Sequence, residues 1–366
     1  MSPTTLVTGA LGQVGKRCTE ILLSRGHTVI AVDLDNDTSQ AAAGALAETA
    51  APGALIPEFI DLTDGDSVKA VVARHRPGAI VHLAAIVSPP SYRNPRLARK
   101  VNVDGTRHLV TAAQALSDPP LFVFASSAAV YGSRNPHRQP ELITGATPVN
   151  PIDHYGEDKV LAEQVIIESG LPFAVLRLAA IVSPDASATF DGDYLVLVRA
   201  TPVDNRMHAT DARDVALAFA NAVDRRNAVA GKVLVIAGND TNRSTMSELQ
   251  DDVMTAVGIG RLGPSVGLPG DPDDDRGWAF TGWFDTTESQ ALLDYQQHDW
   301  SETVAWVGAA MGHRRLLLQA LGPVARPVMR AALAVQRRLE HRGRYADPWT
   351  FMSRKYGSAM LARSEA

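Results

Sequence analysis

Short runs of apolar residues alternate with amphipathic stretches over most of the chain. Residues 4–8 and 28–32 are predicted to be buried strands on either side of a helix that runs through Cys18 and Leu22. Further strands are predicted at 56–60, 79–83, 121–125, 173–178 and 232–236, and helices at 66–75, 96–116, 155–169 and 211–223. Strands that are apolar throughout and separated by helices indicate an α/β fold, a doubly wound parallel sheet covered on both faces. The Ala-rich residues 41–54 are compatible with a helix or a loop.

Two segments interrupt this alternation, 183–210 and 241–285, and both are rich in Pro, Gly, Asp and Thr. In a doubly wound sheet the ligand lies beyond the carboxyl ends of the strands, so these insertions are predicted to build the substrate side. The predicted division is therefore a cofactor-binding core at 1–182, a small substrate-binding region at 183–300 interleaved with the last core elements, and a basic helical extension at 301–366.

The extension differs in charge from the rest of the chain. Residues 301–366 hold eleven basic and four acidic residues, a net charge of +7, whereas the remainder carries −12. Residues 313–344 are predicted to be helical, with breaks at Gly322-Pro323 and at Pro327. Their apolar stripes flanked by arginines fit a peripheral contact with an anionic membrane surface or an acidic partner. A helix docked on its own domain with a solvated basic face, or an oligomer contact, is the favoured interpretation. We expect a homodimer.

Length, net charge and cysteine content limit the classes of protein to which this chain could belong. The chain has 366 residues, 45% of them hydrophobic, which is enough for one large domain or two smaller ones. A net charge of −5 gives no reason to expect nucleic-acid binding. The one cysteine, Cys18, excludes an internal disulfide and fits a reducing compartment. Because Leu6-Val7 leads directly into a glycine loop and no long apolar stretch follows, we expect a cytoplasmic protein without signal peptide or membrane span.

The candidate cofactor site is the segment TGALGQVG at 8–15, in which Gly9, Gly12 and Gly15 follow a strand and open a helix. Glycine permits a tight turn and lets the backbone approach a pyrophosphate, which the helix N-terminus stabilises. Asp33 ends the second strand, where a carboxylate can accept hydrogen bonds from the adenosine ribose and repel a 2′-phosphate. This Rossmann-type unit predicts NAD rather than NADP, although the cations Lys16 and Arg17 could serve a phosphate.

The candidate chemistry lies in Tyr155 and Lys159, four residues apart and therefore on one helix face. A phenol with a pKa near ~10 is a poor base at neutral pH, and a fixed ammonium beside it can lower that pKa. Spacing of this kind is common in ordinary exposed helices. Here it follows a glycine loop and the serine pair Ser126-Ser127, and this order favours a site for proton transfer at a carbon–oxygen bond.

In this order the motifs resemble those of the extended short-chain dehydrogenase/reductase family, the NAD-dependent epimerase/dehydratase class. The resemblance covers roughly residues 4–300 and is specific for the family more than for a substrate. Its marks are TGALGQVG at 8–15, Asp33, Asp61-Leu62, HLAA at 82–85, VNVDGT at 101–106, FASSAAVYG at 124–132, YGEDK at 155–159, LRLAAIVSP at 176–184, RDVA at 213–216 and WFDTTESQALL at 283–293.

The resemblance implies a role for each matching residue. Ser127 would orient the reacting oxygen, Tyr155 would be the general acid/base, and Lys159 would hold the nicotinamide ribose. The implied catalytic residues are thus Ser127, Tyr155 and Lys159. The implied contacts with NAD are Gly9, Gly12, Gln13, Val14, Gly15, Asp33, Asp61, Leu62, Leu83, Ala84, Ala85, Asn102, Tyr155, Lys159 and Ile181.

The motifs define the substrate less closely than they define the cofactor. Many sugar-nucleotide epimerases carry Asn-Pro after the arginine that matches Arg177, and this chain has Leu-Ala-Ala there. The short insertion offers only Arg199 and Arg206 as partners for a diphosphate, and Ser88 begins a Pro-rich segment that would form a rigid, partly apolar wall. The candidate substrate residues are Ser88, Ser127, Arg199 and Arg206.

These observations favour an NAD(H)-dependent oxidoreductase acting on a secondary alcohol or ketone. The alternatives are a nucleotide-sugar epimerase or dehydratase that uses the same three residues and keeps its NAD bound, and a non-catalytic NAD-sensing protein. No metal site is predicted. His82 lies on an apolar strand and is interpreted as structural, and the acidic loop 271–275 lacks the glycine and glutamate that a calcium loop needs.

Overall fold

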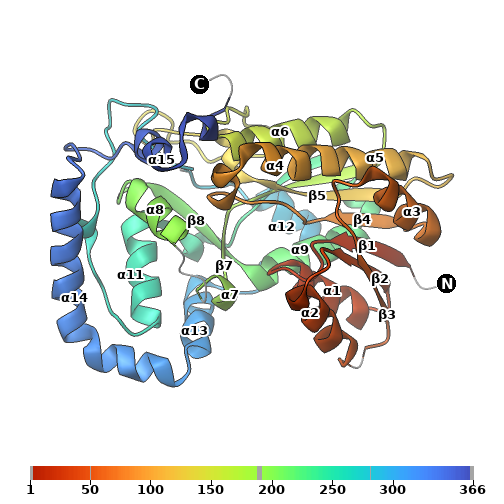
Figure 1. Cartoon of the computed structure of the whole chain (residues 1–366), viewed down its shortest axis with the longest axis horizontal. Coiled ribbons are helices and arrows are strands. Elements are labelled where there is room, and N and C mark those ends of the chain that lie inside the picture. The colour runs from red at the N-terminus through yellow and green to blue at the C-terminus, as the bar shows by residue number, and fades with distance from the viewer. Residues whose placement is uncertain (1–2, 50, 188–191, 281, 363–366) are drawn as a thin grey trace.

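Seven parallel strands form the central sheet of the computed structural model, which describes residues 3–49, 51–187, 192–280 and 282–362. The strand order is β3-β2-β1-β4-β5-β6-β9, as Figure 1 shows in part. The sheet confirms the doubly wound α/β fold that was predicted from the alternating pattern. Its strands are β1 (Thr4–Thr8), β2 (Thr28–Asp33), β3 (Ala54–Phe59), β4 (Ala79–His82), β5 (Leu121–Ser127), β6 (Phe173–Leu178) and β9 (Lys232–Ile236).

The order of the strands places the predicted cofactor site. β1 pairs with β2 on one side and with β4 on the other, with Leu6 opposite both Ile30 and Ile80. The chain therefore reverses its direction of winding beside β1, and a crevice for a ligand opens at the carboxyl ends of the strands at such a point. The glycine loop leaves β1 at this crevice.

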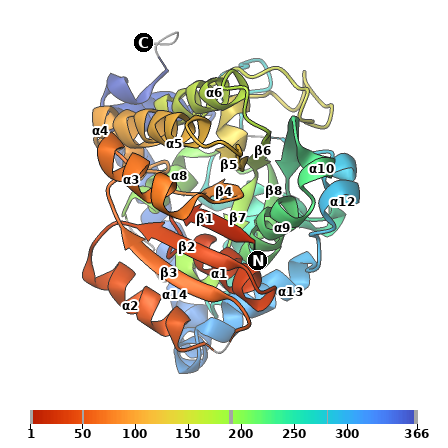
Figure 2. The same cartoon turned by 90° about the vertical axis from the view of Figure 1, so that its right-hand side faces the viewer.

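Helices cover both faces of the sheet, and each face has its own apolar core (Figure 2). On one face α1 packs against α9, and Leu22 and Phe219 are buried there. On the other face α5 packs against α3 and α6, and Val72, Leu109 and Ile166 are buried there. The helices of the two layers are α1 (Gly15–Ser24), α2 (Asp37–Ala47), α3 (Gly65–His75), α5 (Gly105–Gln114), α6 (His154–Ile167), α9 (Ala212–Asp224), α10 (Arg226–Val229) and α12 (Thr287–Leu293).

Two local features differ from the helical pattern of the sequence. The Ala-rich stretch 41–54 is helical as far as Ala47, where α2 ends, and its last residue, Ala54, begins β3. The helix expected at 96–116 consists of α4 (Pro95–Arg99), a π-helical turn at Lys100–Asp104, and α5. Such π turns are often found at functional sites, and this one contains Asn102.

The residues that follow β6 build a second, smaller sheet of three strands in the order β10-β8-β7. β7 and β8 run parallel, and β10 runs antiparallel to β8. The elements of this region are β7 (Ala180–Val182), α7 (Pro184–Ser187), α8 (Gly192–Ala200), β8 (Arg206–Asp211), β10 (Arg243–Thr245), α11 (Met246–Ala256) and α13 (Trp300–Ala310).

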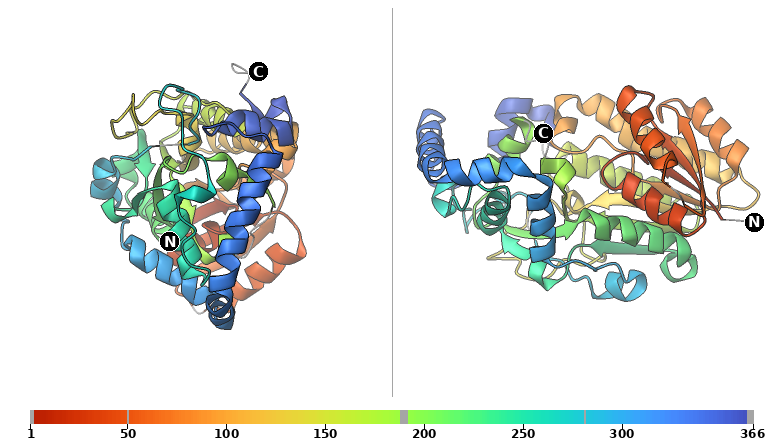
Figure 3. Two further views of the ribbon diagram at one scale, coloured as in Figure 1. Left: turned by 90° about the vertical axis from the view of Figure 1, so that its left-hand side faces the viewer. Right: turned by 90° about the horizontal axis from the view of Figure 1, so that it is seen from below.

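The basic extension contains one long helix, α14 (His313–Leu339), and a short one, α15 (Pro348–Tyr356). The predicted breaks at Gly322-Pro323 and Pro327 are wrong, because α14 continues through both prolines. The prolines leave the carbonyls of Gln319 and Pro323 without helical donors, but these residues are exposed and water can reach them. α14 lies on the outside of the molecule beyond α11 (Figure 3, left), and α15 returns toward α4 and α6 (Figure 1). Within the described part of the chain, no helix has both the length and the hydropathy needed to cross a bilayer.

Candidate active site

The glycine loop is packed so tightly that its first and third positions have no room for a side chain. Gly9 adopts a φ of +63°, and a Cβ atom there would lie 2.8 Å from the Ala84 nitrogen. A Cβ atom on Gly15 would lie 1.9 Å from the Gly9 carbonyl oxygen. At Gly12 the nearest atom to such a Cβ would be 3.4 Å away, so this part of the loop stays open. An open turn of backbone before the N-terminus of α1 fits a pyrophosphate.

Asp33 is fixed beside this loop by two backbone amides. Its carboxylate accepts hydrogen bonds from the Leu11 nitrogen at 3.0 Å and from the Leu34 nitrogen at 2.9 Å. These bonds hold the carboxylate at the end of β2, next to the glycine loop. The position fits recognition of the two ribose hydroxyls of NAD.

The two cations beside the loop share one carboxylate within the chain. Lys16 and Arg17 both pair with Asp185, at 3.1 Å and 2.7 Å. Arg17 also donates to the carbonyl of Gln13, one residue before the N-cap Val14. Asp185 therefore balances one of the two positive charges and engages both side chains, which weakens the case for a 2′-phosphate at this position.

The segment after β4 borders the glycine loop, where cofactor contacts were predicted. The Leu83 and Ala84 amides both donate to Thr8, at 3.2 Å to its carbonyl and 3.3 Å to its hydroxyl. Ala85 follows in the same half-buried stretch. Asn102 is buried and exchanges two hydrogen bonds with the Ile86 backbone, at 2.8 Å and 3.0 Å. Asn102 therefore braces this segment from the π turn.

His82 lies beneath the same segment and has a structural position. It is buried and hydrogen-bonded to the Thr8 hydroxyl at 2.7 Å and to the Thr106 hydroxyl at 3.0 Å. Burial lowers the pKa of its imidazole to about 3. The ring is therefore neutral at physiological pH.

The remaining predicted cofactor residues lie in different surroundings. Asp61 is exposed and caps a turn by accepting from the Thr63 nitrogen at 2.8 Å. Leu62 is buried in the core between the sheet and α3. Ile181 is half-buried on β7 and packs against the core of the opposite face. Their contacts with NAD stay predictions.

The two serines at the end of β5 have different partners. Ser126 is buried and donates to Glu163, which in turn forms a buried ion pair with Arg177 at 2.7 Å. Ser127 is half-buried, caps the following turn by accepting from the Ala129 nitrogen at 3.1 Å, and lies close enough to Tyr155 to lower the pKa of its phenol. The structure thus brings the second serine, and not the first, to the tyrosine.

Tyr155 and Lys159 lie on α6 and are both buried. Burial raises the pKa of the Tyr155 phenol above its usual value, and the hydrogen bond from Ser127 offsets part of this rise. Burial lowers the pKa of Lys159 to about 8, so the ammonium form still predominates at neutral pH. Its Nζ donates to the Ala125 carbonyl at 2.7 Å and lies 5.8 Å from the centroid of the Tyr155 ring. That Lys159 lowers the phenol pKa stays a prediction.

Two further residues beside Tyr155 were not found from the sequence. The Tyr92 hydroxyl donates to the Asp153 carboxylate at 2.6 Å, and both side chains are buried. Asp153 also caps α6 by accepting from the Gly156 nitrogen at 3.0 Å, and burial raises its pKa to about 6. An acidic residue just before a helix is a capping signal that the sequence contained, but its partner Tyr92 is 61 residues away.

A group of His154, Glu157 and Asp158 gathers on the same helix within the spacing of metal ligands. Arg99 occupies this group: its guanidinium pairs with Glu157 and donates to Asp158 at 2.7 Å. Burial raises the pKa of Asp158 to about 6, and the Arg99 hydrogen bond opposes the rise. Because the Arg99 guanidinium already supplies the positive charge at this position, we interpret the group as an ion cluster within the protein and not as a metal site.

The predicted substrate residues lie apart from one another. Ser88 lies close enough to Tyr92 to lower the pKa of that phenol, so it stands near the cluster of Tyr155. Arg199 pairs with Glu340 from the basic extension. Arg206 donates to the Pro140 carbonyl at 2.9 Å and stacks on an indole ring, that of Trp283. Ser88 is thus connected with Tyr155, whereas both arginines contact other parts of the chain.

The basic extension contributes to the surroundings of Tyr155, a possibility the sequence left undecided. Tyr155 shares an apolar cluster with Tyr92, Ala129, Ile152, Val196, Ala200, Ala279, Trp349, Met352 and Met360. Trp349 donates to the Ser133 hydroxyl at 2.8 Å, and the Tyr356 hydroxyl donates to Asp193 at 2.8 Å. α15 therefore packs against the cluster that contains Tyr155.

The parallel sheet and the glycine loop at the end of β1 together define a dinucleotide-binding α/β protein. The sequence of residues 5–237 matches the NAD dependent epimerase/dehydratase family. The chain belongs to this family, which confirms the resemblance seen in its motifs. The family is NAD-dependent, so the prediction of NAD as cofactor is confirmed at the level of the family.

Two curated relatives illustrate the range of the family. D-erythronate dehydrogenase of Cupriavidus necator is 30% identical over 165 residues, which are 44% of this chain and 48% of that protein. UDP-glucose 4-epimerase 2 of Oryza sativa subsp. japonica is 34% identical over 165 residues, which are 44% of this chain and 39% of that protein. The chain thus spans about half the length, or less, of the curated relatives it matches.

Solved structures share the fold at low identity. UDP-glucose-4-epimerase from Stenotrophomonas maltophila, solved with bound NAD and formylated UDP-arabinopyranose, is 21% identical with a TM-score of 0.69. The match covers 87% of this chain and 99% of that one. A putative epimerase from Burkholderia cenocepacia is 20% identical with a TM-score of 0.64, covering 86% and 99% of the two chains.

Proposed function

We propose that this protein is an NAD(H)-dependent oxidoreductase that interconverts a secondary alcohol and a ketone, with Tyr155 as general acid/base. The observation that carries the proposal is the grouping of three side chains: Ser127 lowers the pKa of Tyr155, and the buried Lys159 places its Nζ 5.8 Å from the centroid of the Tyr155 ring. When bound, NAD supplies the nicotinamide that accepts or releases the hydride. Residues 1–182 would hold this cofactor, residues 183–300 would bind the substrate, and residues 301–366 would form the basic extension.

The side chains of the protein carry out the transfer of the proton that accompanies the hydride. In ketone reduction, Tyr155 donates its phenolic proton to the substrate oxygen, and Ser127 orients that oxygen by a hydrogen bond. Lys159 stabilises the phenolate that remains, because it is protonated below its pKa of about 8. In alcohol oxidation the same proton returns to Tyr155.

The surroundings of Tyr155 favour a substrate of low polarity. The cluster around it contains Val196, Met352 and Met360, which offer no charge to a phosphate group. Arg199 and Arg206, the two cations expected for a diphosphate, have partners elsewhere in the chain. A nucleotide diphosphate would have to displace the Glu340 carboxylate from Arg199 to gain that contact.

The second candidate is a nucleotide-sugar epimerase, and the names of several relatives favour it. Such an enzyme would use Ser127, Tyr155 and Lys159 in the same way but return the hydride to its substrate in each cycle. An NAD-sensing protein without catalysis would need the glycine loop and Asp33 but not Tyr155.

The test compares Tyr155→Phe with the parent protein on a panel of secondary alcohols and ketones, followed by NADH absorbance. We expect a loss of turnover of about 10²–10⁴-fold, because proton transfer by a positioned side chain contributes on that scale. NAD affinity, measured by calorimetry, should change little. Tyr345→Phe, at a tyrosine stacked on Arg344 and outside the cluster of Tyr155, is the matched control.

Retained turnover in Tyr155→Phe would remove this residue from the proposed role. Conversion of UDP-sugars without accumulation of NADH, together with NAD that is released only on denaturation, would establish the epimerase instead.

A further inference from the structure

α14 presents a row of large apolar side chains to solvent. Seven of them are between 51% and 74% exposed: Leu316, Leu317, Leu321, Val324, Val328, Val335 and Leu339. Six of these, from Leu317 onward, follow one another at intervals of three, four or seven residues, so they share one face of the helix. We call this set the outer face of α14. A helix of 27 residues makes it about 40 Å long.

Polar contacts on the opposite side fix this orientation. Arg330 donates to the Leu262 carbonyl at 2.8 Å, and Arg337 donates to the carbonyls of Ser265 and Gly267 at 2.8 Å and 2.7 Å. Gly322 is buried against the same loop, where a Cβ atom would lie 2.9 Å from the Ile259 oxygen. Arg330 and Arg337 therefore point toward the protein, and the outer face cannot turn inward without breaking these contacts. Amphipathic helices of soluble proteins normally have the reverse arrangement.

The charge of the helix indicates what covers the outer face. α14 contains six arginines, at positions 314, 315, 326, 330, 337 and 338, and no acidic residue occurs between Glu302 and Glu340. Arg314, Arg315 and Arg338 are exposed at its two ends. A second copy docked on the same face would bring two such arginine sets together, because a two-fold interface uses the same patch twice. A surface of phospholipids with anionic headgroups complements both the arginines and the apolar row.

We propose that the outer face of α14 binds the surface of an anionic phospholipid bilayer. The helix lies parallel to the bilayer, with its leucines and valines among the upper acyl chains and the terminal arginines at the level of the phosphates. Such binding is peripheral, in keeping with the absence of a spanning helix among the described residues.

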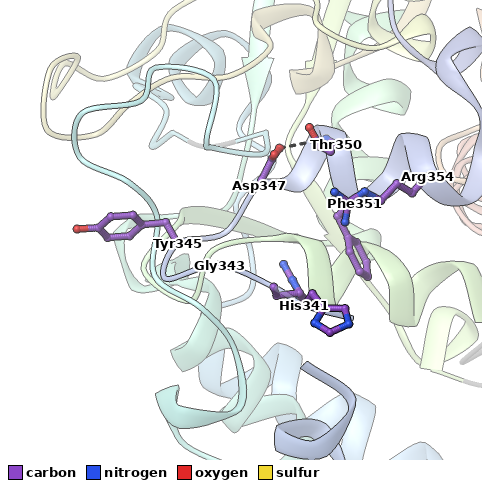
Figure 4. A pocket seen from close by; sticks show the side chains of 8 residues that line it. His341, Gly343, Tyr345, Asp347, Thr350, Phe351 and Arg354 are labelled. Carbon is purple, nitrogen blue, oxygen red and sulfur yellow. Dashed lines mark hydrogen bonds between the residues drawn. The ribbon is translucent and has the colours of Figure 1, made fainter. Parts of the chain in front are cut away.

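The outer face of α14 is connected to the candidate site through the C-terminal end of that helix. Glu340, at the end of α14, pairs with Arg199, and Phe351 on α15 stacks on the same guanidinium at 5.3 Å. Figure 4 shows the small cavity at this junction, of about 100 Å³, into which Phe351 points from α15 toward His341. A second cavity of about 450 Å³, lined by Val196, Arg199 and Phe351 among others, lies between α8 and α15. The bilayer would thus be adjacent to the segment that covers Tyr155.

The test is flotation of the purified full chain with two kinds of vesicle, phosphatidylcholine alone and phosphatidylcholine mixed with an equal part of phosphatidylglycerol. We expect at least tenfold more binding to the anionic vesicles, and a decline with added salt. The triple variant Leu321→Ser, Val324→Ser, Val328→Ser should lose at least tenfold in binding. Because these side chains are exposed, its melting temperature should match that of the parent. A matched control substitutes serine at Leu97 and Ile167, two exposed apolar residues outside α14.

Four outcomes would overturn the proposal: no binding to either vesicle, equal binding to both, equal binding by the parent and the triple variant, or equal loss in the matched control. A parent protein that is dimeric, becomes monomeric in the triple variant and ignores vesicles would assign the outer face to self-association instead.

Discussion

Replacing Gly15 by alanine tests whether the close packing of the glycine loop sets the affinity for NAD. The added Cβ atom would lie 1.9 Å from the Gly9 oxygen, whereas real Cβ contacts stay above 3.0 Å. The loop and α1 must therefore separate by roughly 1 Å, and Gly9 cannot retreat freely because it packs against the Ala84 backbone. Forcing a methyl group into such a site costs about 1–3 kcal/mol of unfolding free energy.

The same displacement moves the loop amides away from the pyrophosphate. A hydrogen bond to a charged group contributes about 1.5–3 kcal/mol, so the loss of one bond weakens NAD binding by about 10–100-fold. The assay is calorimetric titration with NAD, combined with urea unfolding of the free protein. Gly44→Ala is the control: Gly44 lies in α2 with nothing within 4 Å of the added Cβ, so this change should stabilise the protein by about 0.4–1 kcal/mol.

Gly15→Ala that binds NAD within twofold of the parent, and unfolds at the same urea concentration, would refute the reasoning. An equal loss of affinity in Gly44→Ala would show that the effect does not depend on the loop.

Two other predictions concern charges at the site. Asp33→Asn keeps an oxygen for the Leu11 amide but removes the carboxylate charge, so the ratio of NAD to NADP affinity should fall at least tenfold; equal changes in both affinities would contradict the assigned role. Lys159 has a pKa of about 8 in the native state and 10.5 as a free side chain, so between these values the unfolded chain binds the proton and the native chain does not. Its contribution to native stability therefore rises with pH in that window, and the unfolding free energy of the parent relative to Lys159→Met should increase by about 1–3 kcal/mol from pH 8 to 10.5. A difference that stays constant with pH would argue against the lowered pKa.

The fold was predictable because its signals are local. The strands contain short apolar runs, such as Leu6-Val7 in β1 and residues 121–125 in β5, and the glycine loop and Asp33 stand at the ends of β1 and β2. In a parallel sheet, strand ends meet along one edge, so these residues are brought together by topology alone. The choice of Ser127 over Ser126 rested on the family resemblance, and the structure gives its physical reason: Glu163 engages the first serine.

The sequence-based predictions were wrong or incomplete where the structure depends on more than the local apolar pattern. Prolines normally interrupt helices, yet α14 continues through two of them because the carbonyls they leave free belong to exposed residues. The pair of Tyr92 and Asp153, and the packing of Trp349 over the site, join residues far apart in sequence. The periodic pattern of apolar residues does not indicate which distant residues come into contact. The expected homodimer and the individual contacts with NAD stay predictions.

The apolar cluster around Tyr155 has a consequence for biosynthesis. Met360 emerges from the ribosome 205 residues after Tyr155, which takes roughly 10–40 s at ordinary elongation rates. During that interval the glycine loop and Asp33 are available, but the residues that α15 later covers, such as Ile152, still face water. A nascent chain therefore carries an apolar opening beside Tyr155 for tens of seconds, and this opening is a natural point for chaperone binding or for misassembly with a neighbouring nascent chain.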